Sequence, residues 1–167
     1  MPRGSDWLNS YPKDGFGCFE NFGGKKVTAT RNVLYIQPII YKNNSVLTES
    51  LKSNLKKWLE AQYQPCKVEI LPNIFKDVLD QIPLRLLGTQ TNCNGEKQYN
   101  AIGILNQVIG PIQRAKKDAI GVLSFTDVDL FTKQLSNFCF GYGIPSQGGV
   151  QSVHRFTSKF TYESYKT

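Results

Sequence analysis

Apolar residues along the chain occur in short blocks, and several of these blocks have the length and composition of buried strands. RNVLYIQPII (31–40) is apolar on both faces, which is typical of a strand in a covered parallel sheet. CKVEIL (66–71), which Pro72 closes, predicts a second strand. AIGVLSF (119–125) predicts a third, fully buried strand, and GVQSVHRF (149–156) a further one.

Between these blocks lie segments in which apolar residues recur at helical spacing. In TESLKSNLKKWLEAQY, Thr48 is a candidate N-cap with Glu49 in the first turn, and one face is expected to pack on the sheet: Leu51, Leu55, Trp58, Leu59 and Gln62. A second amphipathic helix is expected after a cap near Asn100, and Gly110-Pro111 is expected to strain it. Its apolar face comprises Ala101, Ile104, Leu105, Val108 and Ile112. A short helix is also expected within 73–81.

One short block stands apart. Asn137, Phe138, Cys139, Phe140 and Gly141 predict a short strand at the edge of the sheet, open on one side. This strand follows 119–125 too closely for a crossover helix, so it is expected to run antiparallel. The fold class is therefore α/β (α+β): a twisted, mostly parallel sheet of about five strands with an antiparallel edge strand and two main helices.

The ends of the chain differ from its centre. Residues 1–30 are rich in glycine, asparagine and aromatics without a sustained period, and they predict an irregular N-terminal arm. The subdomain is expected over 31–160, followed by a tail over 161–167. At 167 residues the chain has the length of one domain.

Composition narrows the possible environment and partners. No run approaches the roughly 20 apolar residues of a membrane helix, no apolar signal core begins the chain, and four scattered cysteines form no Cys-x-x-Cys pair. These features favour a cytoplasmic protein with reduced thiols. The net charge is +7, but the cations are dispersed without interleaved stacking aromatics, which does not favour nucleic-acid binding.

Few residues of the sequence are candidates for a catalytic or metal-binding role. Asp127 and Asp129 lie two apart, so in an extended segment both carboxylates would face one way and could hold a metal; the alternative is that they satisfy backbone N–H groups at a strand end. His154 is the only histidine, too few for a zinc site, and is expected to pack or to form a hydrogen bond. Nothing orients His154 as a base for Cys139, and GGKK (23–26) lacks the spacing of a phosphate-binding loop.

An ordered set of segments resembles the archaemetzincins, a family within the metzincin zinc metallopeptidases. The set runs in the same order and at similar spacing: SDWLNSYP (5–12), NVLYIQPI (32–39), LKKWLEAQY (55–63), CKVEILP (66–72), QYNAIGIL (98–105), LSFTDVDLF (123–131), NFCFG (137–141) and GGVQSVHRF (148–156). The resemblance implies a metzincin-like N-terminal subdomain, a twisted sheet backed by a helix, in which NFCFG is the edge strand that lines the cleft.

The chain also departs from that family. The family's His-Glu-x-x-His-x-x-Gly-x-x-His helix, whose histidines bind zinc and whose glutamate is the general base, is absent. The expectation is therefore an N-terminal half that is catalytically incomplete as given, with no cofactor in this chain and zinc only where a catalytic half is present.

Two functional interpretations stay open on the sequence. One is part of an archaemetzincin-like peptidase; the other is a non-catalytic interaction module that binds an extended peptide or partner protein by strand addition at 137–141. In either case the apolar sheet face on which the family's active-site helix would pack is expected to be covered. A partner protein is favoured, and the alternatives are the C-terminal tail 157–167, the aromatic N-terminal arm or a second copy of the chain.

Overall fold

The computed structural model describes residues 27–41, 48–86, 97–132, 138–144 and 148–156. The predicted arm and tail lie almost entirely outside these ranges, and so does Asn137. The helices and strands, in chain order, are β1 (Val33–Ile40), α2 (Glu49–Gln62), β2 (Lys67–Ile70), β3 (Ile74–Phe75), α3 (Lys76–Leu79), β4 (Leu84–Leu86), β5 (Lys97–Asn100), α4 (Ala101–Ile104), η3 (Leu105–Ile109), α5 (Gly110–Ala115), β6 (Ala119–Thr126), β7 (Asp129–Phe131), β8 (Gly141–Ile144), β9 (Gly148–Ser152) and η4 (His154–Phe156).

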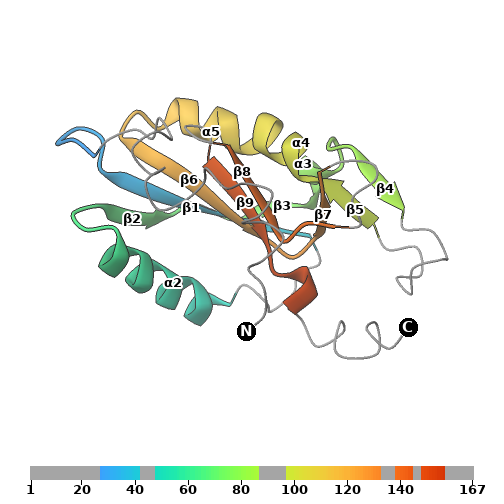
Figure 1. The fold of residues 1–167 in the computed structure, drawn as a ribbon, viewed down its shortest axis with the longest axis horizontal. Helices are drawn as coiled ribbons and strands as arrows, with labels where there is room; N and C mark the ends of the chain where they lie inside the picture. Colours follow the sequence, from blue (N-terminus) through green and yellow to red (C-terminus); the bar gives the residue numbers. More distant parts are fainter. Residues whose placement is uncertain (1–26, 42–47, 87–96, 133–137, 145–147, 157–167) are drawn as a thin grey trace, which may run out of the picture.

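The main sheet has the strand order β2-β1-β6-β9-β8 (Figure 1). β3 adds a short parallel pairing at the end of β1. The pairs β2–β1, β1–β6 and β6–β9 are parallel, whereas β8 is antiparallel to β9. The predicted α/β class, with a mostly parallel sheet and an antiparallel edge strand, is confirmed.

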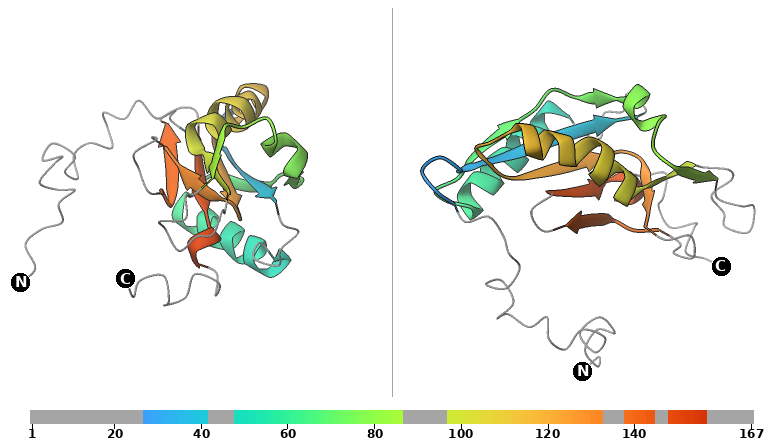
Figure 2. Two further views of the ribbon diagram at one scale, coloured as in Figure 1. Left: turned by 90° about the vertical axis from the view of Figure 1, so that its right-hand side faces the viewer. Right: turned by 90° about the horizontal axis from the view of Figure 1, so that it is seen from above.

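The two main helices cover opposite faces of this sheet. The chain passes from β1 through α2 to β2 on one side of β1, and later returns through α4, η3 and α5 to β6 on the other side. Because both crossovers between parallel strands are right-handed, reversing the direction of travel moves the second helix to the opposite face. Figures 1 and 2 show this arrangement, and two separate apolar clusters result.

Helix α2 begins at the predicted cap but packs less widely than predicted. The Thr48 hydroxyl accepts the Leu51 N–H at 3.1 Å. Leu59 is buried and Leu55 packs partly against the sheet. Leu51 and Trp58 are exposed, which corrects the prediction that the whole apolar stripe packs on the sheet. The row that contains both residues lies to one side of the buried row.

The second helix is confirmed, and its distortion lies where the sequence placed the strain. The Asn100 side chain accepts the N–H groups of Ile102 and Gly103 at 2.9 and 3.1 Å. A π-helical turn, η3, then widens the helix directly ahead of Gly110-Pro111. Proline lacks an N–H and its ring crowds the carbonyl four residues earlier, so a wider turn there relieves the clash.

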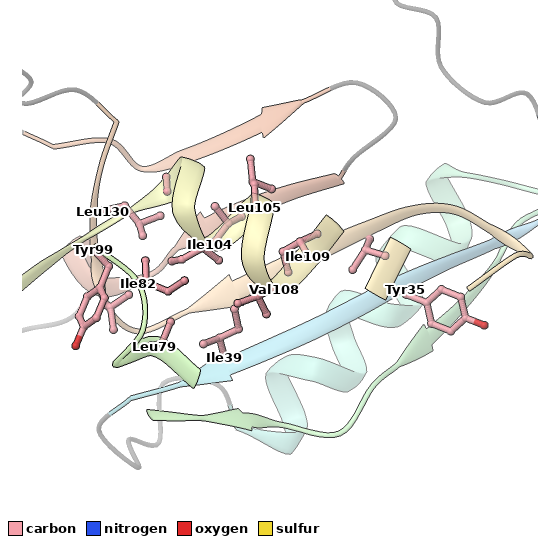
Figure 3. Packing of buried hydrophobic residues seen from close by; sticks show 14 of the residues in the cluster. Tyr35, Ile39, Leu79, Ile82, Tyr99, Ile104, Leu105, Val108, Ile109 and Leu130 are labelled. Carbon is pink, nitrogen blue, oxygen red and sulfur yellow. The ribbon is translucent and has the colours of Figure 1, made fainter. Parts of the chain in front are cut away.

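The apolar side of this helix builds the larger core. Its side chains meet those of β1, β5, β7 and the α3 region in one cluster, which Figure 3 shows: Ile104, Leu105, Val108, Ile109, Ile39, Leu79, Ile82, Tyr99 and Leu130. Val122 and Val150 bring β6 and β9 into the same cluster. This helix therefore fixes the side of β6 and β9 opposite α2.

Strand β6 is buried on one face only, which corrects the prediction of a fully buried strand. Val122, Ser124 and Thr126 are buried under the second helix, whereas Leu123 and Phe125 on the other face are half-buried. The reason is that α2 lies against β2 and β1 and leaves β6 partly uncovered.

No helix in the described part of the chain is long and apolar enough to cross a membrane.

A second sheet was not predicted. β4 pairs antiparallel with β5, and β5 pairs parallel with β7. All three strands are short, and β7 is separated from β6 by only Asp127 and Val128. Strands this short contain too few residues to show an alternation of apolar and polar positions, so the sequence does not predict them.

Candidate functional site

The edge strand exists, but it lies further along the chain than predicted. β8 comprises Gly141–Ile144, so Gly141 is its only residue in common with the predicted segment 137–141. Cys139 instead forms a bridge with Leu130 of β7, in which the Cys139 N–H donates to the Leu130 carbonyl at 2.8 Å. The apolar Phe-Cys-Phe run suggested a strand, whereas the sequence Gly-Tyr-Gly-Ile reads as a turn because glycine is rare within strands.

The register of β8 shows which main-chain groups are open. The Ser152 N–H donates to the Phe140 carbonyl at 2.7 Å, and Tyr142 lies opposite Val150. In an antiparallel pair, hydrogen-bonded residues alternate with residues whose N–H and C=O point away from the partner strand. Because Phe140 and Tyr142 bond toward β9, Gly141 and Gly143 direct their N–H and C=O outward, on the side of β8 where no other strand of the described residues pairs.

A hollow of about 320 Å³ lies over β6, β9 and β8, at the β8 end of the sheet. Its floor is low because Gly141, Gly143 and Gly149 have no side chains, and its apolar lining includes Leu123 and Phe125. The residues that line it are Leu123, Ser124, Phe125, Gly141, Tyr142, Gly143, Gly149, Val150 and Gln151. The open edge therefore borders a shallow, partly apolar depression with room for side chains.

Helix α2 carries exposed apolar side chains beside its buried row. Lys52 bonds Asn73 near β2 at 3.1 Å, which fixes one side of the helix toward β2 and β3. The row of Leu51 and Trp58 lies on the other side of the buried Leu59, and Trp58 is 58% exposed. That a partner covers the apolar side chains left exposed on this side of the sheet remains a prediction.

A buried ion pair lies beneath the start of the edge strand. The Asp129 carboxylate receives two hydrogen bonds from the Arg155 guanidinium, at 2.8 and 2.7 Å, and one from the Gln98 amide at 2.7 Å. It also accepts the Leu130 N–H at 3.1 Å. The Asp129 side chain is 1% exposed, so the two parallel hydrogen bonds from Arg155, which we call the fork, form a buried ion pair.

Asp127 and His154 fix the neighbouring turn. The Asp127 carboxylate accepts the Tyr41 N–H at 2.8 Å, and the Asp127 carbonyl lies 3.0 Å from His154 Nδ1. A carbonyl oxygen can only accept, so Nδ1 carries the proton. The interpretation that both aspartates satisfy backbone N–H groups is confirmed, and so is a hydrogen-bonding role for His154.

The metal hypothesis for the two aspartates finds no support in this geometry. Their oxygens contact N–H groups, a guanidinium and an amide. Within the described ranges, no group of three or more His, Cys, Asp or Glu side chains gathers in a way that could hold a metal ion. Neither Cys66 nor Cys139 forms a disulfide within the described residues, and burial raises the pKa of the Cys66 thiol above its ordinary value.

Comparison with known proteins finds two similar curated sequences, and each match covers most of the chain. No model of a protein family matches. Archaemetzincin-2 of Rattus norvegicus is 26% identical over 169 residues, and that of Mus musculus is 26% identical over 171 residues. Each match covers 97% of this chain and 44% of the relative, so the chain spans less than half the length of these curated relatives.

Solved structures of archaemetzincins are also similar to this chain. Archaemetzincin from Methanopyrus kandleri is 19% identical, with a TM-score of 0.50, and the match covers 78% of this chain and 62% of that one. Archaemetzincin from Archaeoglobus fulgidus is 26% identical with a TM-score of 0.46, over 75% of this chain and 63% of that one. The first likeness shows the fold. The sequence matches show that this chain is similar to archaemetzincins over most of its length.

Proposed function

We propose that this chain supplies the peptide-binding wall of an archaemetzincin-like zinc metallopeptidase, and that it is catalytically incomplete as given. Its part in the reaction is to receive an extended peptide as an additional strand along β8. Main-chain hydrogen bonds would hold the peptide, and alternate side chains would enter the hollow.

The outward main-chain groups of Gly141 and Gly143 carry this proposal. They lie on an edge strand, and a row of unpaired N–H and C=O groups is a template for another strand. Glycine at both positions leaves the approach unobstructed by side chains. Because side chains alternate along a strand, the peptide residues beside these glycines would lie over the hollow lined by Leu123 and Phe125.

The zinc that the family implies does not fit the residues of this chain. The sequence contains a single histidine, His154, and its Nδ1 is bound to the Asp127 carbonyl. A catalytic zinc needs three protein ligands and an open position. No step of peptide hydrolysis is therefore assigned to these residues, and ligands from outside the sequence are required.

The proposal predicts the zinc content and the peptidase activity of the purified chain. The purified chain is expected to retain no stoichiometric zinc after dialysis against zinc-containing buffer and to hydrolyse no peptide substrate, because it has no three-histidine cluster. Elemental analysis and a quenched-fluorescence peptide assay measure both quantities. One tightly bound zinc per chain would contradict the proposal, and His154→Ala would then test the first suspected ligand.

Peptide binding is tested by replacing Gly143. Gly143→Pro removes the outward N–H and places a ring at the edge, so affinity for labelled hexapeptides of alternating apolar and polar residues is expected to fall by at least about tenfold. The substitution leaves the β8–β9 pairing in place, because the Gly143 N–H points away from β9. Fluorescence anisotropy measures the dissociation constants.

Gly143→Ala is the matched control. It keeps the N–H, and its Cβ would lie 3.6 Å from the Gly148 carbonyl oxygen and 3.8 Å from the Gly149 Cα, which are ordinary contacts. Its affinity is expected to stay within about threefold of the unmodified chain. If proline and alanine behave alike, or if no peptide of the set binds, the edge is not the binding site.

A further inference from the structure

Three phenylalanine rings form a continuous cluster beside the start of the open edge. Phe138 and Phe140 meet edge to face, with ring centroids 5.2 Å apart and an interplanar angle of 85°. Phe140 and Phe156 stack at 5.1 Å and 24°. Phe156 belongs to η4, which follows β9, so the cluster joins the segment before β8 to the segment after β9. We refer to Phe138, Phe140 and Phe156 as the aromatic cluster.

A buried ion pair anchors the inner side of this cluster. The Arg155 guanidinium carbon lies 3.8 Å from the centroid of the Phe138 ring. The same guanidinium forms the fork on Asp129, whose carboxylate Gln98 also binds. Contacts therefore run from a buried carboxylate through Arg155 to Phe138, and from there to the outer rings. This support fixes the orientation of the rings before any ligand binds.

The outer rings remain open to solvent. Phe140 is 41% exposed and Phe156 is 69% exposed. Exposed rings that are held in fixed positions are a feature of binding sites, since they offer apolar area at low entropic cost.

The position of the cluster relative to the edge determines what meets it. The Phe140 carbonyl still accepts the Ser152 N–H, and the next residue, Gly141, is the first with outward main-chain groups. An extended peptide paired with Gly141 and Gly143 and continuing in that direction runs alongside Phe140. One of its side chains then lies against the exposed Phe140–Phe156 stack.

We propose that the aromatic cluster is a specificity site that selects an aromatic side chain in the peptide bound along β8. This inference rests on the proposed function. An aromatic ring fits because it can add to the stack of Phe140 and Phe156 by an offset face or by an edge. An acidic side chain is not favoured, because Asp129 already pairs the Arg155 charge.

The test uses labelled octapeptides of alternating threonine and valine, in which one phenylalanine is moved through every position. Anisotropy titrations against the full chain are expected to show a position at which phenylalanine strengthens binding about five- to tenfold over leucine. Phe156→Ala should reduce this preference to below about twofold, and Phe156→Tyr should retain it. Phe75→Ala is the control, since Phe75 is a comparably exposed phenylalanine (55%) on β3, away from the edge.

The outcomes separate the two proposals. If peptides bind and Gly143→Pro abolishes binding, but phenylalanine gives no preference at any position, the edge function stands and the aromatic site is wrong. A preference that survives Phe156→Ala, or that falls equally in Phe75→Ala, also overturns it. If no octapeptide binds, the proposed function and this inference fail together. Circular dichroism confirms that each variant is folded.

Discussion

Replacing Asp129 with alanine is expected to lower the free energy of unfolding by about 3–5 kcal/mol. The substitution leaves the Arg155 guanidinium, whose side chain is only 13% exposed, without its carboxylate. It also removes an acceptor of the Gln98 amide, which is itself buried. Breaking a buried ion pair costs far more than the loss of a surface ion pair, and here a buried amide loses one hydrogen bond as well.

Urea denaturation followed by circular dichroism measures this effect. The matched control is Glu60→Ala, which removes the carboxylate of the partly exposed Lys56–Glu60 pair at 3.8 Å. That pair is expected to contribute less than about 1 kcal/mol. If Asp129→Ala destabilises the chain no more than Glu60→Ala does, the fork between Asp129 and Arg155 is not an anchor of the fold.

Gly148→Ala is expected to destabilise the chain by about 2–4 kcal/mol. Gly148 has a φ of +102°, in the region that residues with a side chain rarely adopt. A Cβ at this position would also lie 2.4 Å from the Val122 carbonyl oxygen and 2.9 Å from Ile109 Cγ2. Backbone atoms of β6 cannot move aside cheaply, so β9 would shift from its place beside β6.

Gly143→Ala serves as the control for thermal denaturation, because its added Cβ meets only ordinary contacts. The melting temperature of Gly148→Ala should fall well below that of Gly143→Ala. Equal melting temperatures would show that the chain tolerates a side chain at Gly148, and that the path of β9 differs from the one described.

The sequence predicted the elements that have enough residues to show a period. β1 follows from a run of apolar residues, β2 from the alternation of apolar and charged residues in 66–71, and α2 and the helix after Asn100 from helical spacing. The caps at Thr48 and Asn100 are local interactions over two or three residues, so local sequence is sufficient to find them.

What the sequence could not predict depends on distant partners. The exposed face of β6 results from where α2 packs, which the composition of β6 does not reveal. The position of β8 was missed because two of its four residues are glycines, which weaken any strand signal.

The same reason limits the candidate site. Asp129 was a candidate from the sequence, but its partners Gln98 and Arg155 lie 31 and 26 residues away. The aromatic cluster likewise joins Phe138 and Phe140 to Phe156 across β9. Part of this clustering was detectable, since the aromatic residues of the predicted edge segment were named, but their stacking on Phe156 required the fold.

Amide hydrogen exchange at β8 tests the central claim most directly. In the free chain, the Gly141 and Gly143 amides should exchange rapidly because they point outward, whereas the Tyr142 amide should be protected by its bond to β9. Saturating peptide should slow exchange at Gly141 and Gly143 by at least about tenfold and leave Tyr142 little changed. Unchanged exchange at both glycines while the peptide is bound would contradict strand addition at β8.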